Sequence, residues 1–218
     1  MTYTREDVAA ALALPPGAAR SDDDLNPSHR IVPDRPRRLA AVLCALREGP
    51  AGLSVVLTRR AAHLRDHAGQ ISFPGGKVAA EDPSPLAAAL REAEEEVGLA
   101  PRQVEILGAL DSYRTSTGYE IRPFVGVVRG AWQPVPDPGE VAEVFEPPLA
   151  FLMDPANRVR ASREWKGASR QFYAMPWGGY YIWGATAGML KGLSDRLRSA
   201  QTLGIARPAQ PVETPGAA

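Results

Sequence analysis

The chain has 218 residues, 44% of them hydrophobic, and its 25 basic residues balance 25 acidic ones, so one compact domain fits and long-range attraction to nucleic acid is not expected. No apolar run is long enough to span a bilayer, and the N-terminus lacks the basic start and apolar stretch of a secretory signal. The single cysteine, Cys44, excludes an intramolecular disulfide, which is compatible with a reducing compartment. Together these features lead us to expect a cytoplasmic protein without a membrane or nucleic-acid partner.

The beginning of the chain predicts a short helix followed by an irregular arm. Thr4 and Asp7 have the spacing of a helix cap, and the helix is expected to run through Leu14. Several prolines between Pro15 and Pro36 then oppose regular structure. The last residues, prolines among small polar side chains, have too little apolar surface to fold. The chain therefore divides into a helix and arm at 1–36, a folded domain at 37–206 and a disordered tail at 207–218.

Apolar runs within the folded domain predict an α/β fold in which a mixed β-sheet lies between helices. We expect strands at 39–46 and 53–58 around a turn at 49–52, further strands at 103–110 and 121–129, and a helix at 183–198.

An acidic helix is predicted at 85–97. Ser84 can cap its start, and Gly98 can adopt the left-handed conformation that ends it. Leucine, alanine and valine side chains share one sector of this helix and can pack on a core. Glutamates at positions i, i+3 and i+4 gather on another sector, and by themselves they are most simply a solvated acidic face. These glutamates are Glu92, Glu95 and Glu96.

The segment before the helix favours a cation site instead. Residues 73–77, Phe-Pro-Gly-Gly-Lys, follow a strand-like stretch, and their two glycines allow carbonyl oxygens to approach an ion closely. Magnesium and manganese prefer a near-octahedral shell of oxygens. Two or three of the glutamates, a loop carbonyl and water can therefore hold such an ion.

Loop and helix together resemble the signature box of the Nudix hydrolases, and the resemblance implies an α/β/α sandwich with Mg2+ or Mn2+ as cofactor. The second half of the box matches fully. In the first half, Arg91 lies one residue farther from Gly76 than in the general pattern, and an aspartate, Asp82, replaces a glutamate. The residues that together carry the resemblance are Gly76, Asp82, Arg91, Glu92, Glu95, Glu96, Gly98 and Leu99.

A second motif, at 57–76, is similar to the one that precedes the box in coenzyme A pyrophosphatases, a subgroup that also tolerates the longer loop. Segments 140–149 and 181–187 are similar to later parts of the same subgroup, so the resemblance covers about 37–198. It implies hydrolysis of coenzyme A or its derivatives to 3′,5′-ADP and 4′-phosphopantetheine or its acyl form. It also implies a small-molecule nucleotide substrate and a possible homodimer.

The same resemblance implies roles for individual residues. Glu95 and Glu96 are the principal metal ligands, Glu92 is a further ligand or positions water, and Gly76 contributes a backbone oxygen. Arg91 is expected to orient the glutamates rather than to contact substrate.

The resemblance also implies a loop acid outside the helix, which contributes either a metal ligand or the base that takes a proton from water. Glu140 and Glu120 are both candidates, and Glu140 is preferred because Glu140-Val141 resembles a recurring site segment.

Basic residues cluster around the upstream motif and can pair with the 3′-phosphate of coenzyme A. Alternatively, they cover a strand end or pair with Asp66, and the histidine among them organises the loop with Gln70. The tryptophans are most simply core or rim residues, although one near the site can stack on adenine. The candidate substrate-binding residues are Arg59, Arg60, Arg65, His67 and Lys77.

Two other functions stay open. The acidic helix serves any diphosphate, so ADP-ribose or NADH is an alternative substrate. A non-catalytic Nudix domain that senses a nucleotide is the alternative of a different class.

Overall fold

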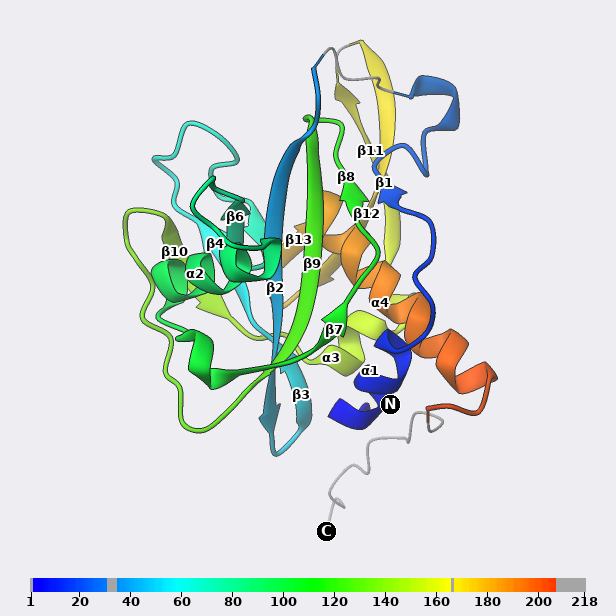
Figure 1. Ribbon diagram of the computed structural model, residues 1–218. Coiled ribbons are helices and arrows are strands. Elements are labelled where there is room, and N and C mark those ends of the chain that lie inside the picture. Colours follow the sequence, from blue (N-terminus) through cyan, green and yellow to red (C-terminus); the bar gives the residue numbers. More distant parts are fainter. Residues whose placement is uncertain (1, 31–34, 166, 207–218) are drawn as a thin grey trace.

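A computed structural model describes residues 2–30, 35–165 and 167–206 (Figure 1), so the predicted tail at 207–218 lies outside the described residues. None of its helices is long and apolar enough to cross a membrane. The helices and strands are α1 (Arg5–Leu12), β1 (Arg20–Ser21), β2 (Arg38–Gly49), β3 (Gly52–Val55), β4 (Leu57–Arg60), β5 (Ile71–Ser72), β6 (Gly75–Lys77), α2 (Pro85–Val97), β7 (Val104–Ala109), β8 (Tyr113–Arg114), β9 (Tyr119–Val128), β10 (Val141–Phe145), α3 (Leu149–Met153), β11 (Val159–Trp165), β12 (Ala168–Trp177), β13 (Tyr180–Trp183) and α4 (Gly184–Thr202), with short 3-10 turns at Pro27–His29, Pro101–Gln103 and Pro155–Asn157.

The central sheet is mixed, as the sequence predicts. Its strands lie in the order β1-β8-β9-β2-β3, while β6 also pairs with β2 and β7 with β9. The long strands β2 and β9 run parallel, whereas β3 and β6 are antiparallel to β2. Two smaller sheets, β10-β4-β5 and β11-β12-β13, flank it.

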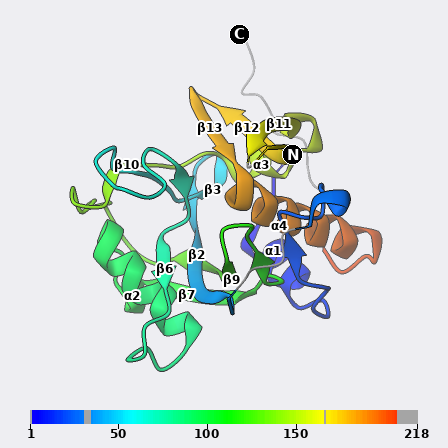
Figure 2. The ribbon, with the colours of Figure 1, turned by 90° about the horizontal axis from the view of Figure 1, so that it is seen from above.

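Helices cover both faces of this sheet, which confirms the expected α/β/α sandwich. Successive side chains of a strand point to opposite faces, and β2 is buried on both. One set, including Leu43, packs with the buried alanines of α2, and the other, including Leu46, packs in the cluster that contains α1 and α4. Seen from above, α2 lies on one side of β2 and β9 while α1 and α4 lie on the other (Figure 2).

Three local predictions differ from the structure. The expected strand at 53–58 is two strands, because β3 pairs with β2 whereas β4 pairs with β10 and β5 in another sheet. The first helix ends at Leu12 rather than Leu14, and Arg196 of α4 donates to the Leu14 carbonyl at 3.0 Å. The arm contains β1, paired in parallel with β8, so it is only partly irregular.

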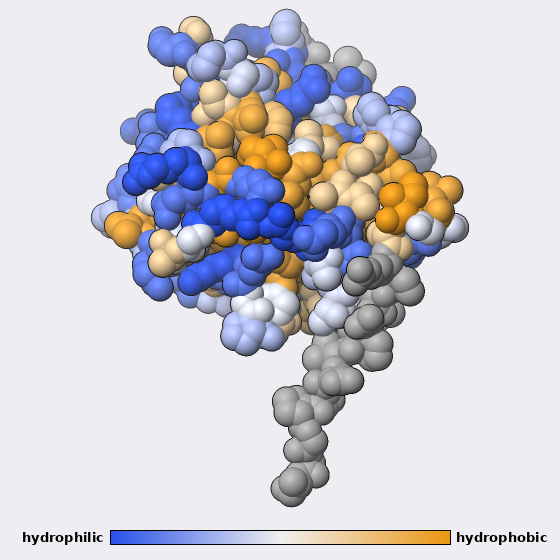
Figure 3. Space-filling model, turned by 60° about the horizontal axis from the view of Figure 1, so that its bottom comes forward, coloured by the Kyte–Doolittle hydropathy of each residue, from blue (hydrophilic) through white to orange (hydrophobic). Residues whose placement is uncertain are grey.

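Apolar side chains also remain on the surface. Leu203 and Ile205, just after α4, are exposed by 63% and 54%. Figure 3 shows several apolar areas separated by polar residues on the face seen there. The possible homodimer stays a prediction.

Two glycines of α4 provide a matched test of how closely this helix packs. A Cβ at Gly188 would lie 2.5 Å from the buried ring of Tyr113, whereas a Cβ at Gly192 would meet nothing nearer than 3.9 Å. Gly188→Ala should lower the free energy of unfolding by about 1–3 kcal/mol through overpacking. Gly192→Ala should raise it by up to about 1 kcal/mol, because alanine favours a helix. Urea unfolding of both variants checks this, and equal effects would contradict the packing described.

Candidate active site

A cavity of about 790 Å³ opens between α2 and the sheet β11-β12-β13. Side chains from segments far apart in the sequence line it, so folding alone brings them together. One end holds acidic residues of α2 and of the loop before β10, together with the two glycines of β6. The other end is formed by the arm around β1, by β11–β13 and by the start of α4.

The ends of α2 confirm the predicted caps. The Ser84 hydroxyl accepts a hydrogen bond from the Ala87 N–H at 3.1 Å, and Gly98 adopts the left-handed conformation with φ 69°. Ala88, Ala89 and Ala93 are fully buried against the sheet, and these small side chains allow the helix to approach it closely. The acidic residues of the last two turns are thereby held at the cavity.

Glu96 is the buried acid of the site, with a side chain only 3% exposed. One oxygen accepts a hydrogen bond from the Gly75 N–H at 3.1 Å, and the other lies 3.7 Å from Nη1 of Arg60. Burial raises the pKa of Glu96 to about 7, and the charges of Glu92 and Glu140 add to this, while Gly75 and Arg60 oppose it. Three carboxylates therefore influence one another at this end of the cavity.

Glu92 lies against the glycine pair of β6. Burial, the largest effect, raises its pKa, and Arg91 opposes the shift. A Cβ at Gly76 would lie 2.6 Å from the Glu92 carboxylate, and one at Gly75 would lie 2.4 Å from the Ala41 carbonyl oxygen. Glycine is required at Gly75, where a Cβ would meet backbone atoms, whereas a Cβ at Gly76 would displace the Glu92 carboxylate.

Arg91 holds the acidic residues in place. Its Nε and Nη2 donate to the two oxygens of Asp82 at 3.0 and 2.9 Å, a two-pronged contact that lowers the pKa of Asp82. Its Nη1 donates to Glu92 at 3.0 Å and to Glu95 at 2.9 Å. Asp82 also accepts from the Ala79 N–H at 2.8 Å. The aspartate that departs from the box pattern thus anchors the arginine and its own loop.

The other predicted acids differ in position. Glu95 is 59% exposed and is not among the lining residues, although one nitrogen of Arg91 joins its carboxylate to that of Glu92. Glu140 lines the cavity beside Glu92 and Glu96. Glu120 does not, and its carboxylate pairs with Arg114 and Arg122 at 3.6 and 3.3 Å.

Three of the five predicted substrate-binding residues line the cavity, namely Arg60, His67 and Lys77. The Nε of Arg60 is buried without a hydrogen-bond partner in the described part of the chain, so it can donate to a bound anion. His67 bonds Gln70 at 2.9 Å, which is the loop contact expected. Arg59 instead pairs with Glu143 at 2.8 Å, and Arg65 is exposed outside the lining.

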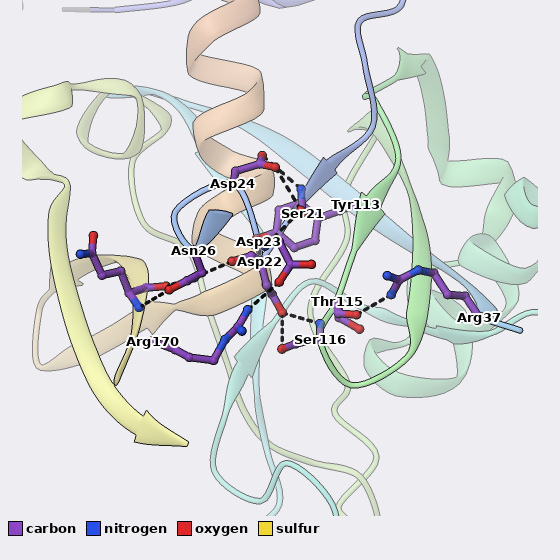
Figure 4. Close-up of polar contacts among 11 residues, drawn as sticks. Ser21, Asp22, Asp23, Asp24, Asn26, Arg37, Tyr113, Thr115, Ser116 and Arg170 are labelled. Carbon is purple, nitrogen blue, oxygen red and sulfur yellow. Dashed lines mark hydrogen bonds and ion pairs between the residues drawn. The ribbon is translucent and has the colours of Figure 1, made fainter. Parts of the chain in front are cut away.

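The arm contributes residues that the sequence analysis missed. Asp22 accepts hydrogen bonds from the Tyr113 hydroxyl at 2.9 Å and from the Ser116 N–H at 2.8 Å (Figure 4). The Asn26 side chain bonds both the N–H and the carbonyl of Gln171, at 2.8 and 2.9 Å. The run Ser-Asp-Asp-Asp-Leu-Asn was the available signal, since such side chains often bond backbone groups.

The acids suit a hard cation without forming a complete cage. Among the residues that the structure describes, no three Asp, Glu, His or Cys side chains are grouped so as to hold a metal ion by themselves. Glu92, Glu96 and Glu140 nevertheless line one end of one cavity and offer only oxygen, the donor that Mg2+ and Mn2+ prefer. A substrate phosphate and water can complete such a site.

Comparison with known proteins identifies the family to which this chain belongs. Residues 36–166 match the model of the NUDIX domain. The chain belongs to the Nudix hydrolase family. Over 170 residues it is 38% identical to an uncharacterized Nudix hydrolase, NudL, of Shigella flexneri serotype 5b, an alignment that covers 78% of the chain and 88% of the relative.

Two further comparisons agree with this family. The chain is 36% identical over 166 residues to the mitochondrial Nudix hydrolase 15 of Arabidopsis thaliana, covering 72% of the chain but only 58% of that longer relative. The crystal structure of a Nudix hydrolase from M. smegmatis, RenU, aligns with a TM-score of 0.52 at 19% identity and covers 81% of this chain and 91% of that one, which shows the same fold.

The raised pKa of Glu96 predicts a pH-dependent effect on stability in metal-free protein. Its folded pKa of about 7 lies above the ordinary 4.5, so ionisation opposes folding and stability falls as the pH rises between these values. Glu96→Gln should therefore be more stable than the wild type by about 1–3 kcal/mol above pH 7, with little gain near pH 4.5. Unfolding across this range checks the prediction, and Glu94→Gln, an exposed neighbour, is the control. A gain independent of pH would contradict it.

Proposed function

We propose that this Nudix hydrolase cleaves the diphosphate of coenzyme A or its derivatives, in a metal-dependent reaction that gives 3′,5′-ADP and 4′-phosphopantetheine or its acyl form. One observation carries the proposal: the segment that resembles the coenzyme A motif and the acids of the box line the same cavity. The motif contributes His67, Gln70 and Phe73, and the box contributes Gly76, Glu92 and Glu96.

We assign the metal to Glu92, Glu95 and Glu96 with the backbone oxygen of Gly76. Mg2+ or Mn2+ bound there would neutralise phosphate charge and lower the pKa of the attacking water. Arg91 fixes the positions of Glu92 and Glu95 before any ligand arrives, because a single nitrogen holds both carboxylates. Glu96 is fixed separately by the Gly75 N–H.

The remaining lining residues have complementary tasks in this proposal. Glu140 accepts the proton of the attacking water, since it is the loop acid that lines the cavity beside Glu92 and Glu96. Arg60 and Lys77 donate to diphosphate oxygens, which places positive charge where negative charge develops. We place the reaction in the cytoplasm.

A substrate panel tests the proposed reaction. The purified protein, with Mg2+ or Mn2+, is incubated with coenzyme A, acetyl-coenzyme A, ADP-ribose and NADH, and the products are identified by mass spectrometry. The proposal predicts 3′,5′-ADP from the first two substrates and slower turnover of the others. Preferred cleavage of ADP-ribose or NADH would show that coenzyme A is not the preferred substrate. Binding without turnover would favour a nucleotide sensor.

The metal assignment predicts which glutamates matter for catalysis. Glu95→Gln and Glu96→Gln keep side-chain volume but remove a charged ligand, so each should lower kcat/KM by about tenfold or more. Glu94→Gln on the same helix should stay near the wild type, because Glu94 is exposed and has no ion pair among the described residues. Steady-state kinetics at saturating metal checks all three. Near wild-type turnover by either of the first two variants would remove that residue from the ligand set.

A further inference from the structure

The far end of the cavity carries a surface that the metal chemistry does not use. We call it the platform, and it consists of one face of the sheet β11-β12-β13. Residues paired across antiparallel strands share a face, and the pairs Arg163 with Arg170 and Ala174 with Trp183 place the platform residues on one side. All five line the cavity. They are Arg163, Trp165, Arg170, Phe172 and Trp183.

Arginines and aromatic rings are interleaved on the platform. The guanidinium of Arg163 lies 5.2 Å from the ring centre of Trp183, and that of Arg170 lies 5.7 Å from the ring centre of Trp165. Phe172 and Trp183 contact each other with centroids 5.0 Å apart. All three rings are only partly buried, although they lie in a cavity. A flat aromatic ligand can therefore stack there.

The charges of the platform are not balanced. Arg163 and Arg170 lie directly opposite each other, an arrangement in which like charges repel. Asp23 of the arm pairs with Arg170 at 2.7 Å and offsets that charge. Arg163 has no acidic partner in the described part of the chain. An anion bound at Arg163 would supply the missing charge.

The start of α4 links the platform to the acidic end of the cavity. At the start of α4, the Thr186 hydroxyl donates to the Ile71 carbonyl at 3.0 Å. Four residues farther along the chain, the Gly75 N–H donates to Glu96. Four residues span at most about 14 Å. Trp183 directly precedes α4, so the same cavity connects the metal end with the platform.

We propose that the platform binds the phosphorylated adenosine end of the substrate, with the 3′-phosphate on Arg163 and the purine stacked on Trp183. This inference rests on the proposed function. It assigns a binding residue to the 3′-phosphate, the group that distinguishes coenzyme A from simpler adenine nucleotides. Arg59 and Arg65 lie outside the cavity lining, whereas Arg163 belongs to it.

Binding of two nucleotides without metal isolates the contact from turnover. The wild type should bind 3′,5′-ADP about tenfold or more tightly than 5′-AMP in calorimetric titrations, as a charge-assisted contact requires. Arg163→Ala should lose that preference while its affinity for 5′-AMP stays within about twofold, and Arg163→Lys should retain part of it. Arg160→Ala is the matched control, because Arg160 lies on the opposite face of the same strand and outside the cavity lining.

The outcomes separate this inference from the proposed function. Equal affinity of the wild type for both nucleotides, or equal losses on both in Arg163→Ala, would overturn the platform assignment. Melting temperatures check that the variants fold. If the wild type does not hydrolyse coenzyme A with Mg2+ but its preference for the 3′-phosphate still depends on Arg163, the proposed function is overturned. The platform assignment then stands.

Discussion

The site depends on the contact between the buried Glu96 carboxylate and the Gly75 N–H. This bond joins the last turn of α2 to β6 and so fixes the acidic helix against the edge of the sheet. It also places a carboxylate where burial opposes its charge, so that the pKa of Glu96 rises to about 7. A folded protein tolerates such a cost at a functional site more readily than elsewhere. The glycines of β6 are part of the same constraint, since a side chain at Gly76 would displace the Glu92 carboxylate.

Arg91 complements this contact from the solvent side. It is held by both oxygens of Asp82, so its remaining nitrogen points toward Glu92 and Glu95 with little freedom. Bidentate pairs of this kind fix geometry as well as charge. The acids are thus positioned from two directions, by a backbone N–H inside the cavity and by an arginine outside it. Positioning before the ligand arrives lowers the entropy that binding must offset.

Local features of the sequence predict local features of the structure well. Ser84 and Gly98 begin and end α2 as expected, because capping depends on a few neighbouring residues. The division of 53–58 between two sheets was not predictable, since it depends on the pairing of β4 with β10, which is distant in the sequence. The same holds for the candidate site. The spacing within α2 predicts a shared acidic face, but it cannot show that Glu95 lies outside the cavity or that Asp22 and Arg163 line it.

The central claim is that the acids of α2 form a metal site, and calorimetric titration of Mn2+ into nucleotide-free protein tests it most directly. The account predicts that the wild type and Glu94→Gln bind Mn2+ with affinities within about twofold, while Glu96→Gln binds at least about tenfold more weakly. Equal affinities of the wild type and Glu96→Gln for Mn2+ would contradict the account.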